Sequence, residues 1–341
     1  MSQDLDQASN RRPRVSIGMP VRNGHRFIRQ ALDSLLAQTF TDFEIVICDN
    51  ASTDQTEQIC REYMARDSRV RYFRNSTNLG PAGNHNKCFN LSRGEYFRWH
   101  AHDDMCHPEY LSKCVELLDG DPSIVVAYPK VLIVDEVGAP LEQYDFHPDT
   151  DGPDPARRFG ALVLINHRKH RACEIFGLMR SSALTQTPLE GAYARGDSVL
   201  LARMALLGRM VEYPERYFLS RSHTSQSMQT LPTASRNGRS FLSRVLGTGP
   251  LPPPEWWDAS RKGKANFPEW NLFKEYWISI ARTENLSAGD RIRCYGVMLR
   301  WLVANVHKLA RDLVFAAETV ISRIKQKVVA SNWRDAGAVG N

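Results

Sequence analysis

Short runs of apolar and β-branched residues alternate with amphipathic stretches through the first 130 residues. Strands are predicted over residues 15–19, 43–48, 70–73, 96–99 and 124–128. Helices are predicted over residues 27–36, 56–65, 83–91 and 108–118. This regular alternation predicts an α/β fold, in which a mostly parallel, Rossmann-like sheet is covered by helices on both faces.

Three loops of this predicted sheet are dense in polar side chains. They comprise residues 20–24, 49–56 and 100–107, and each follows a predicted strand. Because ligands of such sheets bind beyond the carboxyl ends of the strands, these loops are expected to form the functional site.

The pattern is less regular in the second half of the chain. Residues 135–160 are polar and contain four prolines, which predicts a surface excursion, and residues 200–207 form an apolar helical run. Residues 231–268 contain six prolines and predict a linker. Two helical stretches follow at 270–282 and 291–328, and the second is long enough that a break into two helices is expected.

These patterns divide the chain into segments. We expect a disordered N-terminus, an α/β domain with a boundary near residue 130, a proline-rich linker, a basic amphipathic helical extension and a flexible tail. Their respective ranges are 1–13, 14–230, 231–268, 269–330 and 331–341.

The composition narrows the class of protein. Hydrophobic residues make up 42% and charged residues 24% of the 341 residues, which excludes wholesale disorder. No apolar run reaches the roughly 18 residues that span a bilayer, and residues 1–14 lack the apolar stretch of a secretory signal. Seven cysteines without a C-x-x-C motif indicate reduced thiols in a cytoplasmic protein. A net charge of +6 is too small to indicate nucleic-acid binding.

Much of that charge lies near the C-terminus. Residues 292–328 contain seven Lys or Arg and two acidic residues, a net of 7 − 2 = +5, and their apolar positions recur on one helical face. Such a helix could bind an anionic membrane surface, in this case the inner face of the plasma membrane. Alternatively, it could pack on the α/β domain and leave its basic face in water.

Two of the polar loops carry candidate chemistry. Asp49 lies at a strand end, where a carboxylate can accept hydrogen bonds from a ribose or a base, whereas Ser52 or Asp54 could cap the next helix. In the 100–107 loop, adjacent Asp103 and Asp104 could bind Mg²⁺ or Mn²⁺, although Asp104 could instead cap a helix. A zinc hydrolase pattern also begins with His100, His102 and Asp104, but Met105 stands where that pattern requires histidine.

Several motifs together resemble glycosyltransferase family 2, whose members have the GT-A fold. The resemblance covers about residues 14–225. It rests on VSIGMPVRNG at 15–24, QTFTDFEIVICDNASTDQT at 38–56, Asn78-Leu79-Gly80 with Asn86, and Arg93-Gly94-Glu95-Tyr96 leading into Asp103-Asp104. Each motif is weak alone, but four in the right order are specific. The resemblance implies that residues 14–130 bind the nucleotide and that residues 131–230 face the acceptor.

The resemblance also implies roles for individual residues. Asp103 and His223 would hold Mn²⁺ or Mg²⁺. Asp197 and Asp104 would be the catalytic residues, with Asp197 as the general base and Asp104 toward the sugar. The residues implied in binding the nucleotide sugar are Pro20, Val21, Asn23, Asp49, Ser52, Asn78, Gly80, Asn86, His102 and Arg221. Two positions depart from the family pattern, because Ala101 replaces the first acid of the D-x-D motif and His85 stands where an arginine is common.

The function implied is inverting transfer of a sugar from a nucleotide-diphosphate donor to a hydroxyl group. A carbohydrate or lipid-linked acceptor in cell-surface polysaccharide or glycolipid synthesis is expected. Such a transfer needs a base that deprotonates the acceptor hydroxyl and a cation that stabilises the leaving diphosphate.

Alternatives remain open on the sequence. Ala101 would also suit a nucleotide-sugar-binding protein without transfer activity, and zinc-dependent hydrolysis is a further alternative. Asp197 could simply cap the helix that follows it. Trp256 and Trp257 could stack on an acceptor sugar or anchor the linker to the core.

Overall fold

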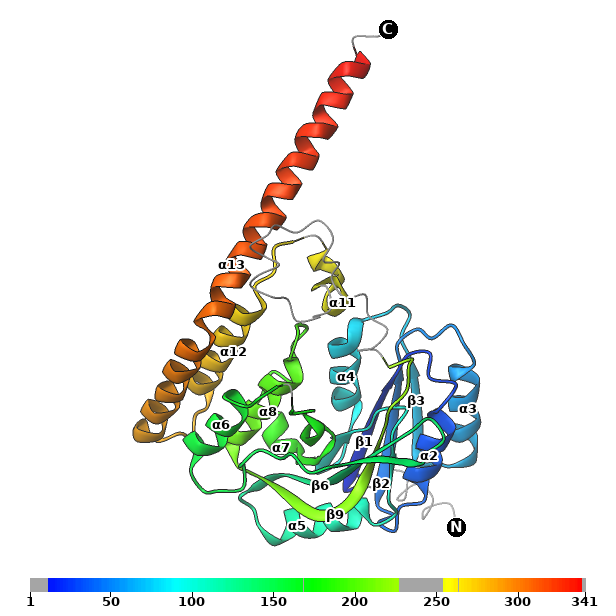
Figure 1. Ribbon diagram of the computed structural model, residues 1–341. Coiled ribbons are helices and arrows are strands. Elements are labelled where there is room, and N and C mark those ends of the chain that lie inside the picture. Colours follow the sequence, from blue (N-terminus) through cyan, green and yellow to red (C-terminus); the bar gives the residue numbers. More distant parts are fainter. Residues whose placement is uncertain (1–11, 168, 227–253, 263, 339–341) are drawn as a thin grey trace.

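The computed structural model describes residues 12–167, 169–226, 254–262 and 264–338. Most of the expected disordered N-terminus and much of the expected linker lie outside these residues. The described chain forms an α/β body from which one long helix projects (Figure 1).

The first half of the sheet is parallel, with the strand order β3-β2-β1-β4. Its strands are β1 (Val15–Val21), β2 (Phe43–Asp49), β3 (Val70–Arg74) and β4 (Tyr96–Trp99). The intervening helices are α2 (Ile28–Leu36), α3 (Thr56–Arg66), α4 (Gly80–Leu91) and α5 (Tyr110–Gly120). The alternation predicted from the sequence is confirmed here, and most boundaries agree within three residues.

The second half of the sheet continues from β4 in the order β8-β6-β9-β5, with β7 paired to β6. Its strands are β5 (Met105–Cys106), β6 (Ile124–Val134), β7 (Pro140–Tyr144), β8 (Leu178–Arg180) and β9 (Arg209–Arg221). Strand β8 is antiparallel to both β4 and β6, so β6 runs in the same direction as the first four strands. Strand β9 is parallel to β6, and therefore its carboxyl end reaches the same edge of the sheet.

Two cores cover the two faces of the sheet, and strand β2 contributes to both. Ile45 and Ile47 face the core built with α2, α3 and α5, whereas Val46 and Cys48 face the other core. This division follows from the alternation of side chains along a strand. It also explains why the strand is apolar at nearly every position.

The expectation of a surface excursion at 135–160 is wrong in part. This range contains β7 and the start of helix α6 (Pro155–Val163), and Phe159 is fully buried. Asp154 caps α6 by accepting a hydrogen bond from the Ala156 N–H group, so a polar, proline-containing stretch here marks the beginning of a packed helix.

Helix α8 (Gly196–Leu207) packs against the sheet and is buried along almost its whole length. It packs against α6 and β6 and also against α12 (Pro268–Arg282). Shorter elements complete this half of the body, namely η1 (Cys173–Phe176), α7 (Ser181–Leu184), α11 (Pro254–Trp257) and η2 (Ala259–Arg261). Because α11 and η2 lie within residues 254–261, the predicted linker is not irregular throughout.

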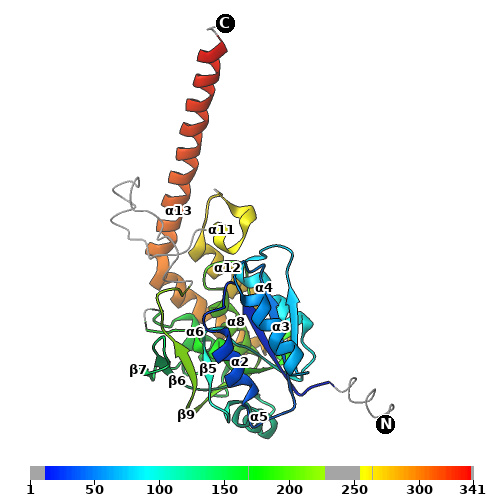
Figure 2. The same cartoon turned by 90° about the vertical axis from the view of Figure 1, so that its right-hand side faces the viewer.

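The C-terminal helix α13 runs without interruption from Ala288 to Ala338, so the predicted break into two helices is wrong. The helix also continues past the expected boundary at residue 330. Met298, Trp301 and Leu309 are buried in the core that covers α8, which confirms the packed alternative for this face of the helix. The far end of α13 extends away from the body in both views (Figures 1 and 2).

A second face of α13 remains exposed although it is apolar. The exposed apolar side chains recur at helical spacing and are Ile292, Leu299, Val303, Val306, Leu313, Val320, Ile321 and Ile324. We refer to these eight residues as the exposed apolar row. Among the described residues, no helix is both long and apolar enough to cross a membrane.

Candidate active site

The polar loops after β1 and β2 are joined by hydrogen bonds between main chain and side chains. Asn23 adopts a left-handed conformation with φ of 54°. Its N–H group donates to Ser52 Oγ at 2.9 Å, and its Oδ1 accepts from the Thr53 N–H group at 2.9 Å. Pro20 and Val21 are buried at the end of β1 directly before this turn. Asn23 and Ser52 therefore fix the two loops in register.

Asp49 is fully buried at the carboxyl end of β2. Its Oδ1 accepts a hydrogen bond from the Ser52 N–H group at 2.8 Å, and its Oδ2 accepts one from the Tyr72 hydroxyl at 2.7 Å. Asp49 thus organises the loop that follows it. The contact with a base that the sequence predicts for this residue stays a prediction.

A network of asparagines connects β2 to the start of α4. Asn50 Nδ2 donates to Asn78 Oδ1 at 2.7 Å and to the Gly80 carbonyl at 3.1 Å. Asn75 Nδ2 donates to Asn50 Oδ1 at 3.1 Å and to Asn84 Oδ1 at 2.8 Å. The predicted residues Asn78 and Gly80 are therefore held in place by buried side chains that the sequence did not single out.

Asn86 joins α4 to the loop that precedes α8. Its Nδ2 donates to the Glu190 carbonyl at 2.9 Å, and its Oδ1 accepts from the Glu190 N–H group at 3.1 Å. This paired contact shows how Asn86 acts in the structure, namely by fixing the position of residue 190. Contact of Asn86 with a nucleotide sugar stays a prediction.

The loop after β4 meets the end of β9 through Asp103 and His223. Asp103 Oδ2 lies 2.9 Å from His223 Nε2, and both side chains are largely buried. His102 lies next to this pair, and burial lowers the pKa of its imidazole. A Cβ added to Gly24 would lie 2.5 Å from Cδ2 of His102, so glycine at this position makes room for the histidine ring.

Hydrogen bonds from Arg221 to Asp103 and Asp104 hold the same loop against β9. The Arg221 N–H group donates to Asp104 Oδ1 at 2.8 Å, and the Arg221 Nε group donates to the Asp103 carbonyl at 2.8 Å. Burial, and then repulsion from Asp103, raise the pKa of the Asp104 carboxyl. The interpretation of Asp104 as a helix cap is wrong, because its partner is a strand.

Arg221 is one of the residues that the resemblance implies in binding the nucleotide sugar. The residue is 1% exposed, and its guanidinium also donates to Gln30 Oε1 at 2.6 Å and to the carbonyl of Glu136. With these partners, the guanidinium holds the 100–107 loop against the body. It acts on the site through Asp103 and Asp104.

Asp103 and His223 are the ligands implied for the metal ion. The described residues contain no group of three His, Cys, Asp or Glu that could hold an ion unaided. However, Mg²⁺ in nucleotide sites is commonly bound through one or two carboxylates, with phosphates and water completing the shell. His223 Nδ1 is buried and has no hydrogen-bond partner in the described part of the chain. One carboxylate beside one such imidazole fits an ion shared with a diphosphate.

The zinc hydrolase alternative is not supported by this geometry. It requires His100 as a ligand, but this residue is fully buried. Its Nδ1 lies 3.2 Å from Nη2 of Arg98, and its Nε2 lies 3.2 Å from the Asp104 carbonyl. Both nitrogens therefore face protein groups, and His100 is a structural residue.

Asp197 lies in the first turn of α8. The structure does not make it the N-cap, because Arg195 occupies that position and Asp197 Oδ1 accepts from the N–H group of the adjacent Ser198. Glu190 lies nearby, and its side chain is 3.8 Å from His85 Nδ1. Burial raises the pKa of the Glu190 carboxyl, and the negative charge of Asp197 raises it further.

Glu190 and Asn50 were missed by sequence reasoning for different reasons. Asn50 stands beside Asp49 in a polar loop, where the abundance of Asp, Asn and Ser indicated it only as one of several. Glu190 lies in an irregular stretch between two helices without a periodic pattern. Its position beside His85 and Asp197 depends on the packing of α4 against the loop before α8.

The first half of the chain is similar to known proteins. Residues 16–184 match the family model described as glycosyl transferase family 2. Over 130 residues the chain is 33% identical to EpsE of Bacillus subtilis, which is named as a glycosyltransferase; the match covers 38% of this chain and 47% of EpsE. Over 126 residues it is 34% identical to the chondroitin synthase of Escherichia coli, covering 37% of this chain and 18% of that protein.

The fold is shared with a solved structure of low sequence identity. TarS 1-349 of S. aureus, in complex with UDP-GlcNAc, superposes with a TM-score of 0.58 at 18% identity. The superposition covers 85% of this chain and 73% of TarS 1-349. The chain spans about half the length of EpsE, and a smaller share of the chondroitin synthase. Through residues 16–184, the chain belongs to glycosyl transferase family 2.

Proposed function

We propose that this protein is an inverting, metal-assisted glycosyltransferase, which transfers a sugar from a nucleotide-diphosphate donor to an acceptor hydroxyl. The observation that carries the proposal is the Asp103–His223 pair at the carboxyl edge of a family 2 domain. A carboxylate and an imidazole at this edge suit a metal ion shared with a diphosphate.

The donor would lie across the loops after β1, β2 and β4. Asn23 and Ser52 join the first two of these loops. Asp49 holds the second loop in place by accepting a hydrogen bond from the Ser52 N–H group. TarS, which shares the fold, binds UDP-GlcNAc in its crystal structure, and this supports a nucleotide sugar as the class of donor.

Asp103 and His223 would hold Mn²⁺ or Mg²⁺ against the donor diphosphate. When bound, the ion supplies positive charge that stabilises the leaving nucleoside diphosphate. Arg221 would keep the Asp103 main chain in place through the hydrogen bond from its Nε group.

Asp197 would act as the general base. Its carboxylate would take the proton of the acceptor hydroxyl while that oxygen attacks the anomeric carbon. The bond from the anomeric carbon to the diphosphate oxygen breaks in the same displacement, which inverts the anomeric configuration. Burial raises the pKa of the nearby Glu190 carboxyl.

The acceptor is proposed to be a carbohydrate or lipid-linked group in cell-surface polysaccharide or glycolipid synthesis. The similarity to a chondroitin synthase supports a polysaccharide.

The protein is proposed to work in the cytoplasm, at the inner face of the plasma membrane. The exposed apolar row of α13 would enter the interface between lipid head groups and acyl chains. Among residues 292–324, every charged side chain in the exposed class is an arginine, namely Arg293, Arg300 and Arg323. This sign of charge suits anionic lipids.

A second candidate function is binding of a nucleotide sugar without transfer. Ala101 favours it, because it removes one carboxylate from the metal site. The two candidates differ in turnover. A thermal-shift panel of nucleotide sugars, with and without Mn²⁺, identifies the donor, and release of nucleoside diphosphate from that donor then indicates an enzyme. Metal-dependent stabilisation without any release would favour the binding protein, and no stabilisation by any nucleotide sugar would refute both.

A further inference from the structure

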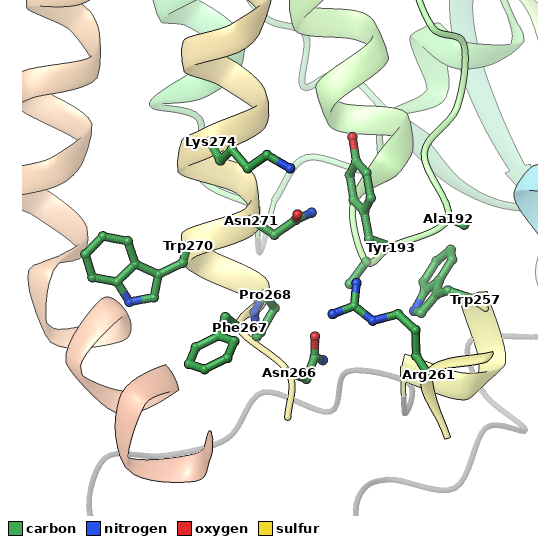
Figure 3. Close-up of a pocket in the computed structure, with 11 residues that line it drawn as sticks. Ala192, Tyr193, Trp257, Arg261, Asn266, Phe267, Pro268, Trp270, Asn271 and Lys274 are labelled. Atoms are coloured by element: carbon green, nitrogen blue, oxygen red, sulfur yellow. The ribbon is translucent and has the colours of Figure 1, made fainter. Parts of the chain in front are cut away.

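A cavity of about 280 Å³ lies between the loop before α8 and the C-terminal elements α11, η2 and α12 (Figure 3). Lys274 and Asn271 project from α12 toward Tyr193, while Trp257 and Arg261 come from the opposite wall. Except for Tyr193 and its neighbours, the lining follows residue 250, and all of it lies outside the matched residues 16–184.

Three lining side chains carry buried polar atoms that find no hydrogen-bond partner within the described residues. These atoms are Tyr193 Oη, Trp257 Nε1 and Asn271 Nδ2. A buried donor without a partner costs free energy, so unpaired donors gathered around one cavity indicate a ligand that accepts hydrogen bonds. Aromatic walls with polar groups are also suited to sugar rings, which present both C–H and hydroxyl groups.

The charge at this cavity is positive. The described residues that line it include two cationic side chains, Arg261 and Lys274, and no acidic one. Lys274 Nζ lies 3.3 Å from Glu275 Oε1, but Glu275 also accepts from Arg203 Nη2 at 2.7 Å and is thereby already paired. Arg261 and Lys274 therefore offer cationic donors to an anionic group.

The cavity is connected to the proposed catalytic base. Tyr193 lies four residues before Asp197, in the loop that leads into α8. The Arg195 guanidinium is 2.5 Å from Glu269 Oε1, and this largely buried ion pair ties the loop to the start of α12. A ligand in the cavity is thus held by the segment that leads directly to Asp197.

Trp257 is also connected to the donor side. A Cβ added to Gly80 would lie 3.0 Å from the Trp257 carbonyl, so the main chain of α11 packs closely on the start of α4. The two interpretations of Trp257 are therefore compatible, because its main chain anchors α11 while its indole lines the cavity.

From these observations we infer that the cavity is an acceptor subsite that binds an anionic saccharide, one carrying a carboxylate or phosphate substituent. The inference rests on the proposed function, since it assigns the substrate class of the same transfer. Tyr193, Trp257 and Asn271 bind the hydroxyl groups, and Arg261 with Lys274 binds the anionic substituent.

Calorimetric titration of the full-length protein tests this inference with three probes. They are a hexuronate-containing hexasaccharide, a neutral hexasaccharide of N-acetylglucosamine, and inorganic phosphate. We expect the acidic hexasaccharide to bind about tenfold more tightly than the neutral one, because charge-assisted hydrogen bonds add to those of the hydroxyl groups. Inorganic phosphate alone is expected to compete only weakly with the acidic hexasaccharide.

Two variants with matched changes in charge sharpen the test. Arg261→Ala/Lys274→Ala removes both lining cations and is expected to abolish the preference for the acidic probe. Lys262→Ala/Lys264→Ala removes two exposed lysines beside η2 that do not line the cavity, and is expected to retain the preference. Trp257→Phe removes the indole donor and is expected to weaken the binding of both saccharides severalfold.

The controls separate this inference from the function on which it rests. Stabilisation by UDP with Mn²⁺ is measured on every variant, and its retention shows that the protein is folded and that the donor site is intact. If UDP stabilises the protein but the two saccharides bind equally, or both pairs of substitutions act alike, the acceptor subsite is overturned. Tight phosphate binding that displaces neither saccharide would overturn it as well. If no nucleotide stabilises the wild type, the proposed function fails first.

Discussion

Asp103 Oδ2 and His223 Nε2 lie 2.9 Å apart although 120 residues separate them in the chain. The contact exists because β9 runs parallel to β6, and its carboxyl end reaches the edge where β4 also ends. Neither residue alone indicates a metal site in the structure. Together they supply a carboxylate and an imidazole at the position where a diphosphate would lie.

His223→Ala is expected to weaken the affinity for the activating metal ion by about tenfold or more, because one of the two proposed protein ligands is lost. The measurement is nucleoside diphosphate release as a function of Mn²⁺ concentration. His107→Ala is the control, since His107 is exposed and stacks on Tyr217 with ring centroids 4.2 Å apart. An equal loss of metal affinity in both variants would contradict the role of His223 as a metal ligand.

Asp197→Asn is expected to lower kcat by about 10²–10⁴, because the acceptor hydroxyl loses its general base. Donor binding should be unchanged, since Asp197 lies on the acceptor side. Steady-state kinetics with the identified donor, together with thermal shift by that donor, separate the two effects. Full activity of Asp197→Asn would refute its role as the base.

Gly24→Ala is expected to displace the His102 ring and to weaken donor binding about tenfold. The added Cβ would lie 2.5 Å from His102 Cδ2 and 2.6 Å from Val21 Cγ2. Gly296→Ala is the matched control, because no described residue outside its own helix turn lies within 4 Å of the added Cβ, and alanine favours a helix by about 0.5–1 kcal/mol. Donor titrations followed by fluorescence would compare the two. Normal donor affinity in Gly24→Ala would show that the site tolerates movement of His102.

Glu190→Gln is expected to stabilise the protein in a pH-dependent manner. Burial raises the pKa of Glu190 in the folded protein above its ordinary value of 4.5. Ionisation therefore costs stability as the pH rises through and above this value, and glutamine avoids that cost. Melting curves should show a variant that is about 2–4 °C more stable at pH 7.5, with the difference vanishing below pH of about 4.5.

Glu116→Gln controls for the general effect of losing a carboxylate, since its side chain is 72% exposed. A pH-independent difference for Glu190→Gln would contradict a raised pKa of the Glu190 carboxyl.

Val303→Glu is expected to reduce binding to vesicles that contain anionic lipid, because it places a charge in the exposed apolar row. Ala304→Glu is the control, as the adjacent residue is also exposed but points away from the row. Co-sedimentation with vesicles measures both. Equal binding by the two variants would show that the row does not contact lipid. Deletion of the whole helix is a poorer test, because Met298 and Trp301 belong to the core.

The parallel half of the fold could be predicted from sequence because its strands are short, apolar and bounded by turn residues. Strand β8 could not, since its three residues form a strand only between β4 and β6. Helix α8 showed its apolar run, but its burial depends on α6 and α12, which pack around it. The unbroken α13 shows that a pattern longer than usual does not require a break.

The candidate site was predictable where local sequence decides the chemistry, as at Asp103 in a polar loop after a strand. The partner of Asp103 entered through a family resemblance, because no local signal connects residues 103 and 223. Arg221 shows the limit of assigning a residue's role from a family resemblance. Its guanidinium is buried among protein acceptors, a fact that depends on Gln30 and on the turn after β6.

The most direct test of the account is metal-dependent release of nucleoside diphosphate from the donor that the thermal-shift panel identifies. The wild type is compared with Asp103→Asn, a change that keeps the size of the side chain and removes its charge. We expect the wild type to release nucleoside diphosphate only with Mn²⁺ or Mg²⁺, and Asp103→Asn to release almost none at any metal concentration. Undiminished, metal-dependent release by Asp103→Asn would contradict the account.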